Sequence, residues 1–364
     1  MIYRCDLRPQ YLLYKKEIIE AILKVLNSGR YTLGEEVKFF EEEFAKYLNI
    51  QSVVGVASGT DALILTLKAL NIGAGDEVIT TAFTAIPTAS SIIAVGAIPV
   101  FVDIDPTTYL IDIDKITNVV SSKTKAVIPV HIFGNVVDIL RLKKILGKRI
   151  AIIEDACQAH GSSIRGKLAG SMGDINAFSF YPTKNVGGYG DGGAIATKKK
   201  SFEKKLKLLR MYGMTDKDHI IINGVNSRLD ELQAAILRVK LKHLDATNRR
   251  RNEIAAVYRG KLRSDLLESQ HVNRDVFCNY HVYSARFKRD RKKFINYLDK
   301  KGIQTNIYYP IPIYLQKANK FLNLKKGALP NTENLCKEVI ALPLYPEMTN
   351  NVLEYVIDMI NKYQ

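Results

Sequence analysis

The chain contains 364 residues, of which 47% are apolar and 25% are charged, enough for a large buried core in one or two domains. No apolar run approaches the roughly 20 residues that cross a bilayer, and the first residues lack the basic and apolar regions of a secretion signal, so a membrane span is excluded and a cytoplasmic protein is expected. The net charge of +16 could attract nucleic acid or a phosphorylated substrate. The basic runs lie on predicted helix faces without interleaved aromatic residues, and this pattern disfavours a nucleic-acid-binding function.

The first predicted element is an amphipathic helix over residues 15–26, because Ile18, Ile22 and Leu26 share one face and Asn27-Ser28-Gly29 ends the pattern. From residue 53 onward, short apolar runs typical of buried strands alternate with helical runs. The expected strands cover residues 53–56, 78–80, 98–104, 126–132 and 150–154. This alternation predicts an α/β fold with a mostly parallel central sheet and helices on both faces.

The alternation changes after Gly173, where strands over residues 175–180 and 194–197 are separated by a glycine-rich loop instead of a helix. A long helix is predicted over residues 228–254. Beyond it the chain is more polar, with short strand candidates at residues 279–287 and 305–309. We expect the long helix to join two domains, a large one of residues 1–246 and a smaller C-terminal α+β domain of residues 247–364.

The glycine-rich loop contains a motif that invites a second interpretation. Gly188-Tyr189-Gly190-Asp191-Gly192-Gly193 matches the G-x-G-x-x-G spacing that binds the pyrophosphate of a dinucleotide. Such a loop must open a helix whose N-terminus meets the phosphates. Here the glycines lead into Ala194-Ile195-Ala196-Thr197, a predicted strand, so the spacing does not indicate NAD binding.

Three candidate groups lie at the ends of predicted strands. Ser58-Gly59-Thr60 opens a helix, where its amides could bind an anion, although Ser58 or Thr60 could simply cap the helix. Asp155 ends a strand at the edge where parallel sheets place ligands, although it could cap the next turn. Lys184 follows another strand; an isolated lysine is usually solvated, but one among apolar residues can act as a nucleophile.

The conjunction of an anion cradle, a carboxylate and a lysine at one sheet edge favours pyridoxal phosphate. This cofactor requires a phosphate cup, a partner for its pyridine nitrogen and an amine that holds it covalently. The six histidines show no spacing typical of a metal site, so no metal is expected. The four cysteines also lack such a spacing and are expected to be reduced thiols: Cys5, Cys157, Cys278 and Cys336.

Six segments resemble the DegT/DnrJ/EryC1/StrS family of sugar aminotransferases, which are pyridoxal-phosphate enzymes with the aspartate-aminotransferase fold, or fold type I. The resemblance runs from about residue 6 to the end of the chain. The segments are Gly29 to Gly34, Ser58 to Leu63, Glu154 to Gly161, Ser179 to Asn185, Gly190 to Gly193 and Asn226 to Ala235.

The resemblance implies how the cofactor is held. Lys184 would attach it covalently and, once freed, would move a proton between the substrate carbon and the cofactor, while Asp155 would hold the pyridinium nitrogen. Phe83 would stack on the ring and Gln158 would contact the 3′-oxygen. The phosphate would be bound by Gly59, Thr60, Ser179 and, from a second subunit, Asn226. A homodimer with shared active sites is therefore implied.

The substrate side is implied in the same way. Candidate sugar-binding residues are Tyr31, Tyr181, Arg228, Tyr309 and Tyr314, although Tyr31 and Tyr181 could be buried tyrosines with satisfied hydroxyls. The chain departs from the family's His-Tyr-Pro-x-Pro-x-His pattern, because Tyr308 and Tyr314 replace both histidines. Residues 281–286 also diverge from the family's usual strand, so an unusual sugar is possible.

The segment from Gly187 to Gly193 is similar to members that aminate C3 of the sugar. The resemblance implies transfer of an amino group from an amino acid, expected to be glutamate, to C3 of a dTDP-3-keto-6-deoxyhexose in two half-reactions. Amination of a UDP-linked 3-keto uronic acid, or of C4 in a nucleotide-4-keto sugar, stays open. Related dehydratases have histidine in place of the lysine, and non-catalytic regulators can lose either key residue, whereas Lys184 and Asp155 are both present.

Overall fold

A computed structural model describes residues 1–364. The centre of the protein is a seven-stranded sheet with the order β1-β9-β8-β5-β4-β2-β3. Neighbouring strands are parallel except where β9 pairs with β1 and β8, so the expected mostly parallel sheet is confirmed. The strands are β1 (Ser52–Val56), β2 (Glu77–Thr81), β3 (Ile98–Val102), β4 (Thr124–Val127), β5 (Ala151–Asp155), β8 (Ile175–Ser179) and β9 (Gly193–Thr197).

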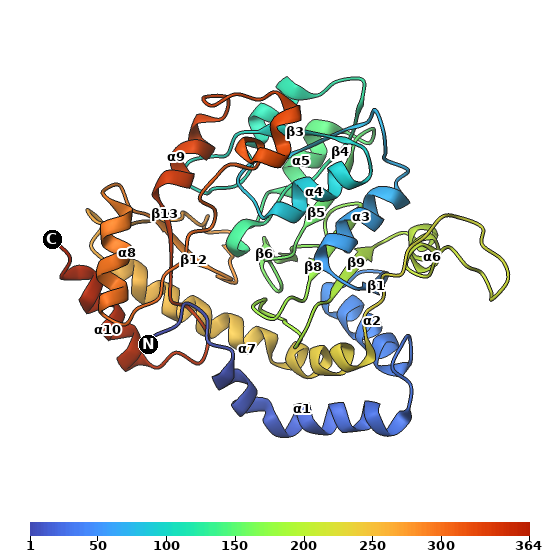
Figure 1. Cartoon of the computed structure of the whole chain (residues 1–364), viewed down its shortest axis with the longest axis horizontal. Helices are drawn as coiled ribbons and strands as arrows, with labels where there is room; N and C mark the ends of the chain where they lie inside the picture. Colours follow the sequence, from blue (N-terminus) through green and yellow to red (C-terminus); the bar gives the residue numbers. More distant parts are fainter.

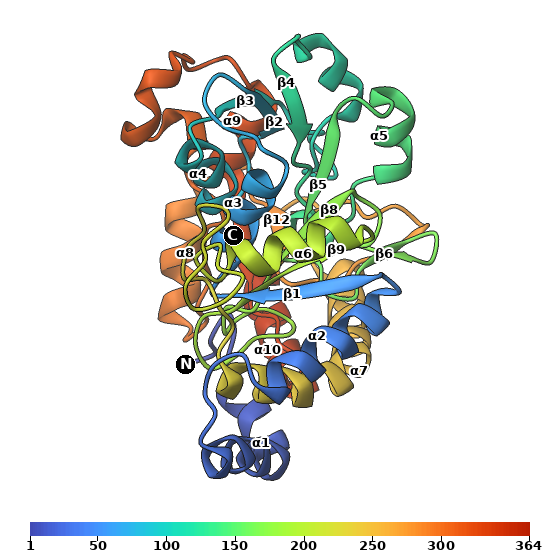
Figure 2. The same ribbon diagram turned by 90° about the vertical axis from the view of Figure 1, so that its right-hand side faces the viewer.

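Helices cover both faces of this sheet, as expected. Because successive side chains of a strand point to opposite faces, Val54 of β1 packs with α3 and α6, whereas Val53 packs with α2 and α7. In Figure 2, β1 separates α6 from α2. The helices of this unit are α1 (Arg8–Ser28), α2 (Glu35–Leu48), α3 (Gly59–Ala69), α4 (Ile86–Ala94), α5 (Ile139–Leu146), α6 (Lys200–Leu209) and the first part of α7 (Glu231–Lys261).

A buried carboxylate joins two of these helices. Glu231, at the start of α7, accepts hydrogen bonds from the amides of Gly34 (2.7 Å), Glu36 (2.8 Å) and Val37 (3.0 Å). These amides belong to the first turn of α2, whose donors have no partner within the helix. Glu231 thus caps α2 and attaches it to α7, which lies between α2 and α1 in Figure 1.

A smaller unit follows, built around a three-stranded antiparallel sheet with the order β10-β12-β13. Its core includes Phe287 and Phe294, whose rings stack with centroids 4.3 Å apart. Its elements are β10 (Glu268–Ser269), β12 (Tyr283–Arg286), β13 (Val339–Leu342), α8 (Arg291–Lys300), α9 (Pro330–Glu338) and α10 (Asn350–Asn361); β6 (Ser163–Ile164), β7 (Lys167–Leu168) and β11 (Val276–Phe277) form a further small sheet.

The expected boundary near residue 246 falls inside α7, which runs without a break. Leu241 and Leu244 pack against the central sheet, whereas Ile254 and Tyr258 belong to the core of the smaller unit. One helix therefore serves both cores. The division into domains 1–246 and 247–364 stays a prediction.

Two expectations about single elements need revision. The strand candidate at residues 305–309 is wrong: only Asn306 forms an isolated bridge, to Ala341, because Pro310 and Pro312 follow and lack the amide that a strand ladder needs. In α1, Ile18 and Val25 are buried, but Leu23 and Leu26 remain about half exposed, so its apolar face is only partly covered within one chain. No helix is long and apolar enough to cross a membrane.

Candidate active site

A cavity of about 220 Å³ lies at the edge of the sheet where β1, β2, β5 and β8 end. This is the edge at which parallel sheets bind ligands. The three candidate groups meet here, since the lining includes Ser58, Gly59, Thr60, Asp155, Ser179 and Lys184. A larger cavity of about 690 Å³, formed mainly by residues 268–280, contains none of these groups.

The turn before α3 combines a helix cap with an anion site. The Ser58 hydroxyl accepts a hydrogen bond from the Asp61 amide (3.1 Å), so Ser58 caps α3. The next residues, Gly59 and Thr60, line the cavity at the positive end of that helix. A Cβ atom on Gly59 would lie 2.6 Å from Cβ of Ser179, so only glycine lets the two strand ends approach.

Asp155 and Glu154 are adjacent carboxylates with different surroundings. Asp155 faces the cavity, where its Oδ2 accepts a hydrogen bond from the Thr88 hydroxyl (2.8 Å) and its Oδ1 accepts one from the Cys157 amide (3.2 Å). These two hydrogen bonds fix the orientation of the buried carboxyl group. Asp155 therefore presents an oriented carboxyl group to the cavity.

Glu154 is completely buried on the other side of β5. Its carboxylate accepts hydrogen bonds from His131 Nε2 (2.8 Å) and from the amides of Gly170 (2.8 Å), Met172 (2.6 Å) and Gly173. Burial alone would raise the pKa of Glu154, but the His131 hydrogen bond and the backbone amides outweigh it and hold the pKa below its usual range. Glu154 is a structural anchor for the loop at residues 170–173.

Lys184 lies in the loop after β8, where its amide bonds to the carbonyl of Tyr181 (2.8 Å). Its side chain is partly buried and forms no hydrogen bond within the chain. Burial lowers the pKa of Lys184 from its usual range, although the neighbouring Cys157 and Asp155 partly oppose this shift. A lowered pKa increases the neutral fraction of the amine, which is the nucleophilic form.

Gln158 connects the cavity to the Tyr308-Tyr309 segment. Its Oε1 accepts a hydrogen bond from the Phe133 amide (2.8 Å) and its Nε2 donates one to the Tyr309 hydroxyl (3.1 Å). Both Gln158 and Tyr309 are thereby held in place. Burial raises the pKa of Tyr309 above its usual range, so the hydroxyl stays protonated.

Comparison with known proteins identifies the family. Residues 13–361 match the model of the DegT/DnrJ/EryC1/StrS aminotransferase family. The chain belongs to this family. It is 43% identical over 364 residues to dTDP-3-amino-3,6-dideoxy-alpha-D-galactopyranose transaminase from Aneurinibacillus thermoaerophilus, covering 100% of this chain and 99% of that protein.

Two further similarities extend the comparison. The chain is 36% identical over 347 residues to UDP-2-acetamido-2-deoxy-3-oxo-D-glucuronate aminotransferase from Pseudomonas aeruginosa, which covers 95% of this chain and 96% of that one. The crystal structure of DesV from S. venezuelae in complex with a ketimine intermediate superposes with a TM-score of 0.95 at 38% identity, covering 99% and 98% of the two chains. The aspartate-aminotransferase-like fold expected from sequence is confirmed.

The cavity of this aminotransferase fits pyridoxal phosphate on its own chemistry. The Gly59 cradle and the start of α3 suit a phosphate, the oriented Asp155 suits a pyridinium nitrogen, and Lys184 offers an amine of lowered pKa. The sequence predicted these three groups and their meeting at one edge of the sheet.

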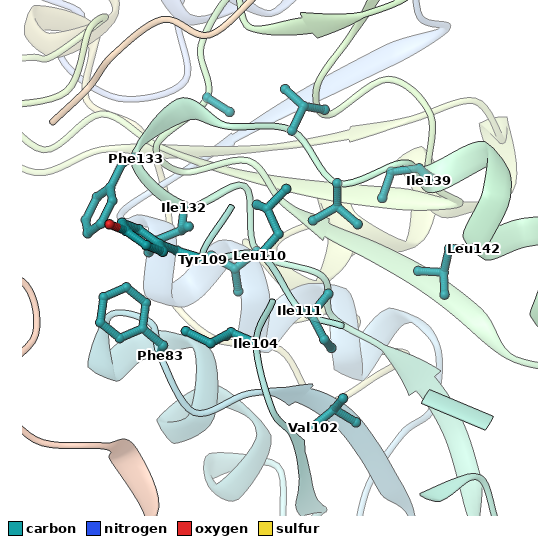
Figure 3. Packing of buried hydrophobic residues seen from close by; sticks show 14 of the residues in the cluster. Phe83, Val102, Ile104, Tyr109, Leu110, Ile111, Ile132, Phe133, Ile139 and Leu142 are labelled. Carbon is teal, nitrogen blue, oxygen red and sulfur yellow. The ribbon is translucent and has the colours of Figure 1, made fainter. Parts of the chain in front are cut away.

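Phe83, expected to stack on the cofactor ring, lies beside the cavity without lining it. It is fully buried, and its ring packs near Tyr109 and Phe133 (Figure 3) as well as near Tyr309. Its stacking on the cofactor stays a prediction. The cavity wall that follows β2 is formed by Thr84, Ala85, Pro87 and Thr88.

The expected substrate residues divide into two groups. Tyr181 is 53% exposed and lines the cavity, whereas Tyr31 is 51% exposed outside it, so neither is the buried tyrosine of the simpler interpretation. Tyr314 does not reach the cavity: it is buried, packs near Phe101 and donates its hydroxyl to Glu333 (2.5 Å). Its contact with the sugar stays a prediction.

Asn226 and Arg228 lie outside the cavity of their own chain. Asn226 is exposed, while Arg228 is half-buried beside Met211. Between them, Ser227 accepts a hydrogen bond from the Ala57 amide (3.1 Å) and donates one to Asp61 (2.7 Å). This segment is thus attached to the anion turn while its flanking side chains face outward.

Thr88 and Asp191 are site residues that sequence reasoning missed. Thr88 orients Asp155 and also bonds to Thr84 (2.9 Å), while Asp191 lines the cavity from the glycine-rich loop. Thr88 could have been found, because Pro87 opens a helix directly after a predicted strand and so places the next residue at the same sheet edge.

Proposed function

We propose that the protein is a pyridoxal-phosphate-dependent aminotransferase that moves an amino group from an amino acid, most simply L-glutamate, to the ketone of a nucleotide-linked sugar. The observation that carries this conclusion is the meeting of Lys184, Asp155 and the Gly59-Thr60 turn around one cavity in a member of an aminotransferase family. When bound, the cofactor supplies an electron sink for bond changes at the carbon that bears nitrogen.

The residues of the chain have separate roles. Lys184 holds the cofactor and then, once released, carries a proton to and from the reacting carbon, a task suited to an amine of lowered pKa. Asp155, oriented by Thr88, keeps a pyridinium nitrogen protonated. The turn at Gly59 and Thr60, together with Ser179, binds the phosphate and fixes the orientation of the ring.

For the sugar, we propose C3 of a dTDP-3-keto-6-deoxyhexose. The high identity to a dTDP-3-amino-3,6-dideoxyhexose transaminase supports this choice. A UDP-linked 3-keto uronic acid is the second candidate, supported by the relative that acts on a 3-oxo-glucuronate. Tyr181 at the cavity, Tyr309 beside Gln158, and Tyr31 and Arg228 near the outer surface are proposed as sugar-binding residues.

We also propose a cytoplasmic homodimer in which Asn226 completes the phosphate site of the partner. Asn226 is exposed and lies outside its own cavity. Leu12, Ile19, Leu23 and Leu26 expose an apolar face of α1 that a second subunit would cover. Four free cysteines are compatible with a reducing compartment.

The cofactor and substrate are tested together. The reconstituted protein should be yellow, lose its colour on addition of L-glutamate, and regain it with the correct nucleotide-linked keto sugar. Lys184→Ala should lack the attached chromophore. A panel of dTDP- and UDP-linked 3-keto and 4-keto sugars distinguishes the candidates, and a protein that stays colourless after reconstitution contradicts the proposal.

The shared site is tested by complementation. Lys184→Ala and Asn226→Ala chains should each have low activity alone. In a mixed dimer, one site would contain both intact residues, so activity should reappear when the two variants are coexpressed. Absence of recovery in a verified mixed dimer would place Asn226 in a purely intrachain role.

A further inference from the structure

Asn185, the residue after Lys184, uses its whole side-chain amide in buried hydrogen bonds. It is only 5% exposed. Its Nδ2 donates to Oδ1 of Asn248 (2.8 Å) and to the carbonyl of Asn279 (3.1 Å), and its Oδ1 faces Nδ1 of His281 (3.3 Å). Both N–H donors and the oxygen of this amide are therefore engaged.

These hydrogen bonds are the only polar attachment of the Lys184 loop, residues 182–187, to distant parts of the chain. The amide of Lys184 itself bonds locally, to the carbonyl of Tyr181 (2.8 Å). Val186 packs in the core beside the central sheet, but apolar packing is not directional. The orientation of the turn at Lys184 therefore depends on Asn185.

The partners of Asn185 belong to both units of the protein. Asn248 lies in α7, which extends from α2 to α10 in Figure 1, whereas Asn279 and His281 precede β12 of the smaller unit. Asn248 and Asn279 are both 0% exposed, so water does not compete for their hydrogen bonds. Loss of one partner would leave the other buried and unsatisfied.

The same network reaches the loop that follows Asp155. The side-chain amides of Asn248 and Asn279 both donate to the carbonyl of His160 in that loop, at 2.8 and 3.0 Å. The carboxylate and the lysine of the cavity therefore lie beside loops that share one set of buried amides.

The hydrogen bonds of the network run in only one direction. A carbonyl only accepts, so the nitrogen of the Asn185 amide faces Asn279 and its oxygen faces His281. Nδ1 of His281 is then the donor. Burial lowers the pKa of His281 well below its usual range, so the ring is neutral and carries its single proton on Nδ1. A fully satisfied network of this kind specifies one geometry.

We propose that Asn185 is a positioning residue, which together with Asn248 holds the Lys184 loop so that the lysine keeps its amine in the cavity. The inference rests on the proposed aminotransferase function. Neither asparagine lines the cavity, so each acts through Lys184 and not on a ligand. Because a misplacement of about 1 Å can cost a reaction about a hundredfold in rate, α7 contributes to catalysis from outside the cavity.

The first measurement is the rate at which pyridoxal phosphate attaches to the cofactor-free protein, followed by its chromophore. Asn185→Ala and Asn248→Ala each break the hydrogen bond between these two side chains, and each should slow attachment at least about tenfold. A lowered thermal midpoint with an unaltered rate of attachment would indicate a purely structural role and overturn the proposal.

Asn252→Ala is the matched control. Asn252 lies one turn further along α7 and donates to the carbonyls of Asn248 (3.0 Å) and Cys278 (2.6 Å), but not to Asn185. Its replacement should lower the thermal midpoint, because two hydrogen bonds are lost, yet leave the rate of attachment unchanged. Equal slowing in Asn252→Ala would show that any loss of stability has this effect, and would overturn the proposal.

A double-mutant cycle tests whether Asn248 acts through Asn185. In the Asn185→Ala background, Asn248→Ala should slow attachment by less than about twofold more, because the shared hydrogen bond is already lost. Effects that multiply would overturn this coupling. In the donor half-reaction each single variant should lower kcat at least about tenfold with the KM for L-glutamate within about twofold. A raised KM with unchanged kcat would place the network in donor binding instead.

His281→Phe keeps the proposal testable if an asparagine variant does not fold. It removes the donor to Asn185 Oδ1 and retains a ring, so attachment should slow at least about threefold. An unchanged rate in this variant would overturn the proposal. If the unaltered protein attaches no pyridoxal phosphate, the aminotransferase proposal itself fails, so the two failures are distinguishable.

Discussion

Replacing each carboxylate of the Glu154-Asp155 pair with its amide should show that Glu154 stabilises the fold, whereas Asp155 is needed for cofactor binding and transamination. In the unaltered protein each carboxylate oxygen of Glu154 accepts hydrogen bonds from two N–H donors. In Glu154→Gln one of these two oxygens becomes an NH2 group. A change of His131 tautomer gives no relief, because His131 Nδ1 already accepts from the Val137 amide (3.1 Å). Either orientation of the amide leaves two of these donors without an acceptor and adds a buried NH2 group that has none.

The size of the effect follows from this count. At about 1–3 kcal/mol for each buried unsatisfied group, Glu154→Gln should lower the free energy of unfolding by about 4 kcal/mol. Asp155→Asn differs, because the remaining oxygen can accept from the Cys157 amide while the new NH2 group donates to the Thr88 hydroxyl. Its stability should stay within about 1 kcal/mol of the unaltered protein.

The assay is urea unfolding of the cofactor-free forms, combined with a titration of cofactor binding. Glu154→Gln should unfold at a lower urea concentration, while Asp155→Asn should unfold normally but bind the cofactor weakly and lose transamination. The cofactor-free state is used so that weaker cofactor binding does not appear as lost stability. Equal unfolding midpoints for the two variants would refute this division of roles.

Three further outcomes are expected. Gly59→Ala should weaken cofactor binding, because the new Cβ atom would lie 2.6 Å from Cβ of Ser179. The control Gly260→Ala, in open space on α7, should bind the cofactor normally and gain stability. Cofactor-binding titrations of both variants check this prediction. Burial lowers the pKa of His160 to about 3, so the ring stays neutral in the folded protein but is protonated in the unfolded chain below its usual pKa. The free energy of unfolding should therefore fall between about pH 6 and 3, with a loss of about 2 kcal/mol at pH 5. This loss should be missing from acid unfolding curves of His160→Phe. Tyr309→Phe should leave Gln158 Nε2 without its acceptor and lower activity more than stability, measured as kcat and thermal midpoint.

The elements that carry the site were largely predictable from sequence. Strand ends are marked by short apolar runs, and parallel pairing brings their carboxyl ends to one edge, so the meeting of Asp155 with the Gly59-Thr60 turn followed from pattern and topology. That the glycine motif leads into a strand was also predictable, and Gly193 indeed begins β9.

The orientations of aromatic side chains were not predictable in this way. Phe83 and Tyr314 follow sequence patterns that imply ligand contact, yet one packs in a ring cluster and the other bonds to Glu333. Both outcomes depend on residues distant in sequence, such as Phe133 for the first.

These differences share one physical cause. Backbone groups at strand ends are placed by the sheet, so sequence suffices for the Gly59 cradle and for Asp155. Tyr309, which bonds to Gln158 in the cavity wall, is placed instead by packing against Phe83 and Phe133, both distant from it in sequence. The groups proposed to hold the cofactor therefore lie at strand ends of one sheet, whereas Tyr309, proposed to contact the sugar, depends on packing between distant parts of the chain.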